Sequence, residues 1–291
     1  MKCDAKFFGS AGIPVIDLSK TSLVSLAEKS AGMGLTVPGV QKKLSLHLSD
    51  EDSARLTLIG LPAGYILKPQ SDDFRELPEA EDLAMDIADA MGVRTSPHGL
   101  IELDGELAYI TKRADRREGE SYAMEDFCQL SGRLTEDKYK GSYERCAKII
   151  KEYSLMPGFD LSEFFLRLAV CFATGNSDMH LKNFSLIEMH PGKRDFVLSP
   201  AYDLLPVNLV MPEDTEETAL TLNGKKSKLS RDDFLALASN IGMNQKSAEN
   251  ILSNVVKHKA DALNLISTSY ISDDMKQTFT ELVEERISRL S

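Results

Sequence analysis

The sequence lacks any long, uninterrupted hydrophobic run. Its longest apolar stretch, residues 164–173, contains Arg167 and is about half the length that a membrane-spanning helix needs. The first residues also lack the apolar core of a secretory signal. Only 4 cysteines are present, far apart and without a C-x-x-C pair, so neither a disulfide framework nor a zinc site is expected. These absences predict a cytoplasmic protein with no membrane partner.

Positive charge is also scarce. The chain has 34 Lys and Arg against 45 Asp and Glu, which gives a net charge of −11 and a pI near 5.1. Binding to a phosphate backbone over a broad surface needs clustered positive charge, so this kind of nucleic-acid binding is disfavoured. One local basic run, residues 225–228, is more typical of a solvated turn. A few local cations could still bind a small anion.

The 291 residues are 42% apolar and 27% charged, which is typical of a folded soluble chain with about two domains. Alternating or short apolar runs predict strands at 43–48, 56–59 and 64–68, a helix at 77–91, and a hairpin around Asp104 and Gly105. Beyond a charged linker at 113–120, helical spacing recurs near 124–131, 142–153, 161–174, 231–240, 246–265 and 273–290. Two strands, 184–188 and 195–198, interrupt these helices.

This order of elements predicts an α+β, two-lobed fold. Residues 1–113 would form a sheet-rich N-terminal lobe. Residues 114–291 would form a mainly helical C-terminal lobe with an inserted β-hairpin.

One set of polar residues brackets the inserted hairpin. Asp178 and Asn183 form a D-x-x-x-x-N pattern in the loop before it, and Asp203 follows it. Phosphotransferases of the protein-kinase type use this layout, in which the first Asp accepts or orients the hydroxyl proton. The Asn and the second Asp hold Mg²⁺, which prefers oxygen ligands. Asp178 and Asn183 alone could be ordinary loop caps. The ordered set therefore carries the prediction of a two-lobed protein-kinase-like fold, with the catalytic and metal-binding loop in the C-terminal lobe.

The N-terminal half supplies the remaining parts of such a site. Lys68 ends a predicted strand, where a lysine can bind the phosphates of ATP. Glu81 on the next helix is the best candidate partner for it, with Glu79 and Asp82 as alternatives. The loop at residues 34–43 could cover phosphates with its backbone N–H groups. This loop is neither a G-x-G-x-x-G loop nor a P-loop.

Several of these segments resemble the HipA family of bacterial serine/threonine kinases, which act as toxins of toxin–antitoxin systems. The most specific segment is 175–185, with the pattern G-N-[ST]-D-x-H-x-K-N-[FW]-[SA]. The other matching segments are 36–44, 65–69, 80–85, 125–129 and 202–205. The resemblance covers roughly residues 35 to 290.

The resemblance implies a role for each matching residue. Asp178 would be the catalytic base, and Asn183 and Asp203 the Mg²⁺ ligands. The residues that would contact ATP are Val37, Pro38, Gly39, Val40, Gln41, Lys68, Glu81, Lys112, Arg113, Ala114, His180, Asn183, Tyr202 and Asp203. Thr36, at a position where the best-studied members carry serine, would be the autophosphorylation site.

The resemblance also implies partners. A DNA-binding antitoxin would make most of the contact with operator DNA, and the substrate would be an aminoacyl-tRNA synthetase or another translation component. The chain looks like the short, HipT-like members, in which a small companion subunit replaces an N-terminal subdomain. Two alternatives remain open: a small-molecule kinase of the same fold, and a nucleotide-binding pseudokinase.

Overall fold

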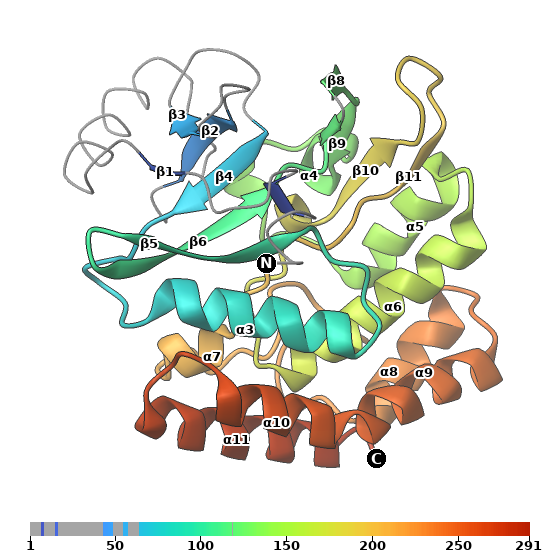
Figure 1. Cartoon of the computed structure of the whole chain (residues 1–291). Helices are drawn as coiled ribbons and strands as arrows, with labels where there is room; N and C mark the ends of the chain where they lie inside the picture. Colours follow the sequence, from blue (N-terminus) through green and yellow to red (C-terminus); the bar gives the residue numbers. More distant parts are fainter. Residues whose placement is uncertain (1–6, 9–14, 17–42, 49–54, 58–63, 118) are drawn as a thin grey trace. The chain divides into compact units, whose positions relative to one another are not determined.

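The computed structural model describes residues 7–8, 15–16, 43–48, 55–57, 64–117 and 119–291. Residues 1–82 and 96–121 form one compact unit, and residues 83–95 and 122–291 form another. The first unit is built mainly of strands and the second mainly of helices, as the sequence predicts (Figure 1).

A six-stranded sheet dominates the first unit, in the order β1-β3-β2-β4-β6-β5. Its strands are β1 (Val15–Ile16), β2 (Leu44–Leu48), β3 (Arg55–Thr57), β4 (Tyr65–Lys68), β5 (His98–Leu103) and β6 (Glu106–Lys112). Only the β1–β3 pair is parallel among these described strands. Alternate residues of β2 and β4, such as Leu44, Leu46 and Leu67, are buried in one apolar cluster. This is the outcome that the period-two pattern predicts.

The predicted hairpin forms at Asp104 and Gly105. Both residues have positive φ, 53° and 82°, as a two-residue hairpin turn requires. The predicted charged linker is partly wrong, because β7 (Arg116–Arg117) and β8 (Glu120–Ser121) pair in antiparallel fashion there. Helix α3 (Leu77–Ala90) follows β4 and begins at Leu77, as the sequence predicts.

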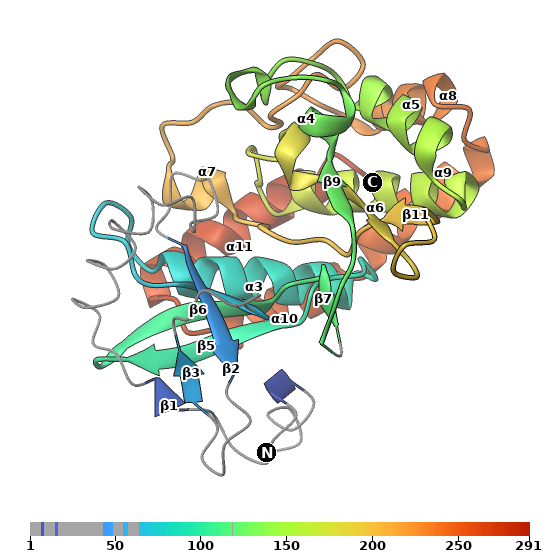
Figure 2. The same cartoon turned by 90° about the horizontal axis from the view of Figure 1, so that it is seen from above.

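Helix α6 (Pro157–Ala173) is the central helix of the second unit. It is buried along most of its length and packs against α5, α9 and α11. Figure 2 shows α5, α8 and α9 grouped beside it. The helices here are α4 (Phe127–Leu130), α5 (Tyr143–Tyr153), α7 (Val207–Val210), α8 (Arg231–Asn240), α9 (Gln245–Lys257), α10 (Lys259–Thr268) and α11 (Asp273–Ser288), with the short turns η1 (Thr135–Asp137) and η2 (Leu181–Asn183). None of the described helices has the length and hydropathy to cross a membrane.

The inserted hairpin is β10 (Ser185–Glu188) and β11 (Phe196–Leu198). The structure adds a third strand, β9 (Met124–Asp126), which pairs with β10. The predicted helix at 124–131 is therefore wrong in its first residues and is reduced to α4. The predicted helix at 246–265 is two helices, which meet at His258.

Gly175 lies just after the end of helix α6, in a closely packed part of the chain. Its φ is +67°, and an alanine Cβ there would lie 2.6 Å from Leu282 Cδ2 and 3.3 Å from Asn208 Cβ. We expect Gly175→Ala to lower the free energy of unfolding by about 3 kcal/mol, from left-handed strain and overpacking together. Urea denaturation measures this loss.

The matched control is Gly192→Ala, because Gly192 has a φ of +72° and no atom within 4 Å of the added Cβ. It should lose only the strain, about 1 kcal/mol. Equal losses in the two variants would contradict the packing at Gly175.

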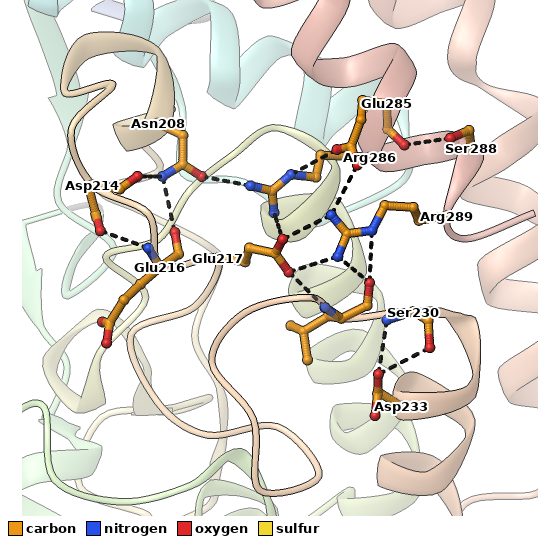
Figure 3. A network of polar contacts seen from close by, with 11 residues as sticks. Asn208, Asp214, Glu216, Glu217, Ser230, Asp233, Glu285, Arg286, Ser288 and Arg289 are labelled. Atoms are coloured by element: carbon orange, nitrogen blue, oxygen red, sulfur yellow. Dashed lines mark hydrogen bonds and ion pairs between the residues drawn. The ribbon is translucent and has the colours of Figure 1, made fainter.

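A polar network joins the end of helix α11 to the segment before α8 (Figure 3). The Glu217 carboxylate accepts hydrogen bonds from both Nη atoms of Arg289, at 2.9 and 3.0 Å, and lies 3.6 Å from Arg286 Nη1. It also accepts the backbone N–H of Leu229 at 2.8 Å. Burial acts to raise the pKa of Glu217, but these donors outweigh it, so the pKa is lowered.

This lowered pKa predicts a pH-dependent contribution to stability. The stabilisation is complete above the ordinary glutamate pKa of 4.5 and is lost as the pH falls through the lower value of the folded state. We expect Glu217→Gln to lower the free energy of unfolding at pH 7 by about 3 kcal/mol. This is the low end of the range for breaking a buried ion pair, because the Arg289 side chain is 25% exposed.

The neighbouring Glu216 provides the control. Its side chain is 51% exposed and pairs with Lys226 at the surface, so Glu216→Gln should change stability by less than about 0.5 kcal/mol. Denaturation curves between pH 3 and pH 7 should show the gap between Glu217→Gln and the wild type closing in acid. A gap of the same size at every pH would refute the assignment.

Candidate active site

The loop after α6 holds two of the predicted residues together. Asn183 Nδ2 donates a 2.8 Å hydrogen bond to the backbone oxygen of Asp178. The Asp178 N–H in turn donates to Asn176 Oδ1 at 3.1 Å. Asn183 and Asn176 are buried, whereas the Asp178 side chain is 43% exposed. The backbone is thus fixed while the Asp178 carboxylate reaches solvent.

His180 lies in the same loop and is buried. Burial lowers its pKa more than the nearby carboxylates of Asp178 and Asp203 raise it, so the ring is neutral at pH 7. Its Nδ1 accepts the backbone N–H of Lys182 at 3.3 Å, so the proton of the neutral ring is on Nε2. That Nε2 lies 3.9 Å from Asp178 Oδ2.

Tyr139 is a contact of Asp178 that the sequence did not reveal. Its hydroxyl donates a 2.7 Å hydrogen bond to Asp178 Oδ1, and its ring meets His180 edge to face. Burial, reinforced by Asp178, raises the pKa of Tyr139. The phenol therefore stays protonated and orients one oxygen of the carboxylate. Tyr139 lies just after the short turn η1, where the sequence has no periodic pattern that would predict its contact with Asp178.

Two further contacts hold the loop in place. Lys182 Nζ lies 2.8 Å from Asp126 Oδ2, at the start of α4. The Tyr202 hydroxyl donates to the backbone oxygen of Lys182 at 3.0 Å and lies 2.6 Å from Ser185 Oγ. Burial raises the pKa of Tyr202, so this hydroxyl also stays protonated. Tyr202 thus binds the loop to β10, and Lys182 is a second residue that the sequence analysis did not assign.

Asp203 has an unusual backbone. Its φ is +59°, a value that few residues other than glycine adopt, and such strain often accompanies functional positions. It lies close enough to His180 to affect the pKa of that ring. The amide nitrogen of Asn183 is engaged, which leaves Oδ1 as its acceptor. An amide oxygen and a carboxylate are suitable ligands for Mg²⁺, and the residues present fit this ion.

The described residues contain no group of three or more His, Cys, Asp or Glu side chains placed to hold a metal ion.

In the first unit the structure brings Lys68 and Glu81 together. Lys68 Nζ pairs with Glu81 Oε1, and both side chains are almost fully buried. Lys68 Nζ also lies over the ring of Tyr109, 5.3 Å from its centroid. Two other carboxylates were alternatives to Glu81 as the partner of Lys68. One, Asp82, instead lies 3.8 Å from His98. The other is Glu79, whose pKa is raised by burial.

Lys112, Arg113 and Ala114, which the resemblance places in contact with ATP, lie at the end of β6 and directly after it. Lys112 Nζ lies over the rings of Phe7 and Tyr65, at 5.6 and 5.8 Å from their centroids, and burial lowers its pKa. Arg113 makes a two-pronged pair with Asp115 at 2.9 and 2.8 Å.

The backbone oxygen of Ala114 accepts a hydrogen bond from Arg117 Nε at 3.0 Å. The predicted phosphate-loop residues Val37, Pro38, Gly39, Val40 and Gln41, and the predicted phosphorylation site Thr36, lie outside the described residues.

The basic run at 225–228 is engaged within the protein. Lys225 pairs with Asp233 at 2.7 Å and Lys226 with Glu216 at 3.0 Å. These pairs favour the interpretation of this run as a solvated turn rather than as a DNA-binding patch.

Comparison with known proteins identifies the family. The model of the HipA-like C-terminal domain matches residues 35–263, which is most of the chain. The chain belongs to the HipA-like C-terminal domain family. The loop with Asp178, the Lys68–Glu81 pair and Asp203 all lie inside the matched range. The resemblance predicted from the sequence is thus confirmed at the level of the family.

Relatives of this HipA-like chain carry kinase names. The putative kinase Y4dM of Sinorhizobium fredii is 34% identical in an alignment of 227 positions that covers 72% of this chain and 54% of that protein. A putative kinase of Haemophilus influenzae is 25% identical over 310 residues, covering 96% of this chain and 88% of that protein. The HipA-like chain therefore spans about half the length of Y4dM and most of the Haemophilus protein.

Solved structures show the same fold. HipA, from the Shewanella oneidensis complex with HipB and operator DNA, matches with a TM-score of 0.73 and 16% identity, over 97% of this chain and 73% of that one. The proinflammatory kinase CtkA of Helicobacter pylori matches with a TM-score of 0.60 and 14% identity, over 85% of this chain and 93% of that one. The predicted kinase-like α+β fold is thereby confirmed.

Proposed function

We propose that this protein is an ATP- and Mg²⁺-dependent protein serine/threonine kinase, acting as the toxin of a bacterial toxin–antitoxin system. The observation that carries the proposal is the hydrogen bond from Asn183 to the backbone of Asp178. It fixes a solvent-facing carboxylate and an amide oxygen in one loop, at the spacing that kinase chemistry uses. Membership of the HipA-like family supports the same conclusion.

In this proposal each residue has a limited task. ATP supplies the phosphoryl group, and Mg²⁺ offsets its negative charge. Lys68, held by Glu81, binds phosphate oxygens, while Asn183 and Asp203 hold the ion. Asp178 orients the acceptor hydroxyl and takes its proton. The Tyr139 hydroxyl keeps the Asp178 carboxylate in place, and neutral His180 lies beside it.

We assign the remaining partners by family. The substrate is a protein of the translation machinery, such as an aminoacyl-tRNA synthetase. A DNA-binding antitoxin binds this chain, as HipB and operator DNA accompany the Shewanella HipA. A small companion subunit resembling the N-terminal subdomain is a further partner, and Thr36 is the site of autophosphorylation.

Induced expression in bacteria, followed by mass spectrometry of phosphopeptides, tests this function. The matched inactive variant is Asp203→Asn, because asparagine tolerates the positive φ at this position while it removes the charge. We expect growth arrest and a new phosphoserine or phosphothreonine on a translation component with the wild type alone. Unchanged growth, with a phosphorylated metabolite in place of a phosphoprotein, would point to a small-molecule kinase.

A further inference from the structure

Residues 208–217 contact the loop that carries Asp178 at two points. The backbone N–H of Asn208 donates to the oxygen of Gly175 at 2.9 Å. Ser177 Oγ donates to Asp214 Oδ2 at 2.6 Å, and Ser177 is 5% exposed. A hydrogen bond to a carboxylate is about twice as strong as one between neutral groups. The residue directly before Asp178 is thus held by a charged acceptor.

Asp214 is itself held in one orientation. Its Oδ1 accepts the backbone N–H of Glu216 at 3.0 Å, which leaves Oδ2 directed to Ser177. The Asn208 side-chain amide donates to the backbone oxygens of Asp214 and Glu216, at 3.0 and 3.1 Å. The segment from 208 to 216 is therefore a closed turn rather than a loose connection.

The same turn is fastened to the C-terminal helix. Arg286 Nη2, on α11, donates to Asn208 Oδ1 at 3.2 Å, so all the polar atoms of the Asn208 side chain are used (Figure 3). Arg286 also lies beside Glu217, which Arg289 binds. A continuous chain of polar contacts runs from α11 through Asn208 and Asp214 to Ser177.

We infer that Asp214 is a positioning residue for phosphoryl transfer, acting through Ser177 on the direction of Asp178. The inference rests on the proposed kinase function. The Asp178 side chain is 43% exposed, so packing alone does not hold its carboxylate. Misplacing a catalytic group by about 1 Å can cost roughly a hundredfold in rate. Release of Ser177 should therefore lower the rate of transfer without weakening the binding of ATP.

A double-mutant cycle tests this role. Ser177→Ala, Asp214→Ala and the double variant are compared for transfer of labelled phosphate from ATP to the proteins of a bacterial lysate. We expect each single variant to lower kcat roughly 10- to 100-fold with KM for ATP within about twofold, and the double variant to fall no further. Asp214→Asn, which retains an acceptor oxygen, should recover most of the rate. Glu213→Ala, at an exposed acidic neighbour, is the control and should match the wild type.

Backbone hydrogen exchange provides the independent readout. In Asp214→Ala the amides of residues 175–183 should exchange faster than in the wild type, while those of α9 are unchanged. The positioning role is wrong if the wild type is active but Asp214→Ala keeps kcat within twofold. It is also wrong if the fold-loss of kcat in the double variant equals the product of the losses in the two single variants. If the wild type itself transfers no phosphate, the kinase proposal fails, and the positioning role of Asp214 fails with it. Unchanged exchange in the loop would overturn the structural step on which the inference depends.

Discussion

Replacing Asp178 with asparagine should lower phosphoryl transfer by roughly 10²- to 10⁴-fold, the range that a general base contributes. Asparagine has the same shape and keeps an oxygen that can accept the Tyr139 hydroxyl, but it cannot take a proton from the substrate. Because the Asp178 side chain is 43% exposed, removal of its charge should leave the free energy of unfolding within about 1 kcal/mol of the wild type. Labelled ATP and urea denaturation measure the two quantities.

Asp195→Asn is the matched control. Asp195 also accepts a side-chain hydrogen bond, from His190 at 2.6 Å, but lies in the turn between β10 and β11. It should retain the wild-type rate. If Asp178→Asn retained it too, Asp178 would not be the base.

Breaking the Lys68–Glu81 pair should have the largest effect on stability. Both side chains are almost fully buried, at 4% and 1% exposure. Removal of one partner from a buried pair costs about 3–5 kcal/mol, because the remaining charge loses its compensation. We therefore expect Glu81→Ala to lower the free energy of unfolding by about this amount and to lower phosphoryl transfer as well.

Replacement of both residues separates stability from chemistry. Lys68→Met with Glu81→Met puts unbranched apolar side chains in the same space, and such replacements of a buried pair are often neutral or stabilising. The double variant should thus unfold at a urea concentration close to that of the wild type. It should still lose roughly 10²- to 10³-fold in transfer, since no cation remains to bind phosphate oxygens. A stable double variant with wild-type activity would exclude Lys68 from the phosphate site.

Much of the fold could be predicted from the sequence because its signals are local. The alternation in β2, the turn at Asp104 and Gly105 and the apolar face of α6 each depend on neighbouring residues. The predicted contact partners Lys68 and Glu81 are only 13 residues apart, at the end of β4 and in the first turns of α3. The order of Asp178, Asn183 and Asp203 around a hairpin was likewise visible in the chain itself.

The features that the sequence did not reveal depend on distant partners. Met124–Asp126 is a strand only because it pairs with β10, some sixty residues later, so its local helical spacing was misleading. The break at His258 has no glycine or proline to mark it. Tyr139 and Asp214 contact the loop through their side chains and Asn208 through its backbone N–H, and such isolated contacts leave no periodic pattern.

Transfer of labelled phosphate from ATP, measured with Mg²⁺ and with a chelator in its place, tests the central claim most directly. The wild-type protein should label itself or proteins of a bacterial lysate only when Mg²⁺ is present. Asp178→Asn should label neither, and Asp195→Asn should label the same proteins as the wild type does. No transfer by the wild type to any protein, with Mg²⁺ and ATP in excess, would contradict the account and would indicate a nucleotide-binding pseudokinase.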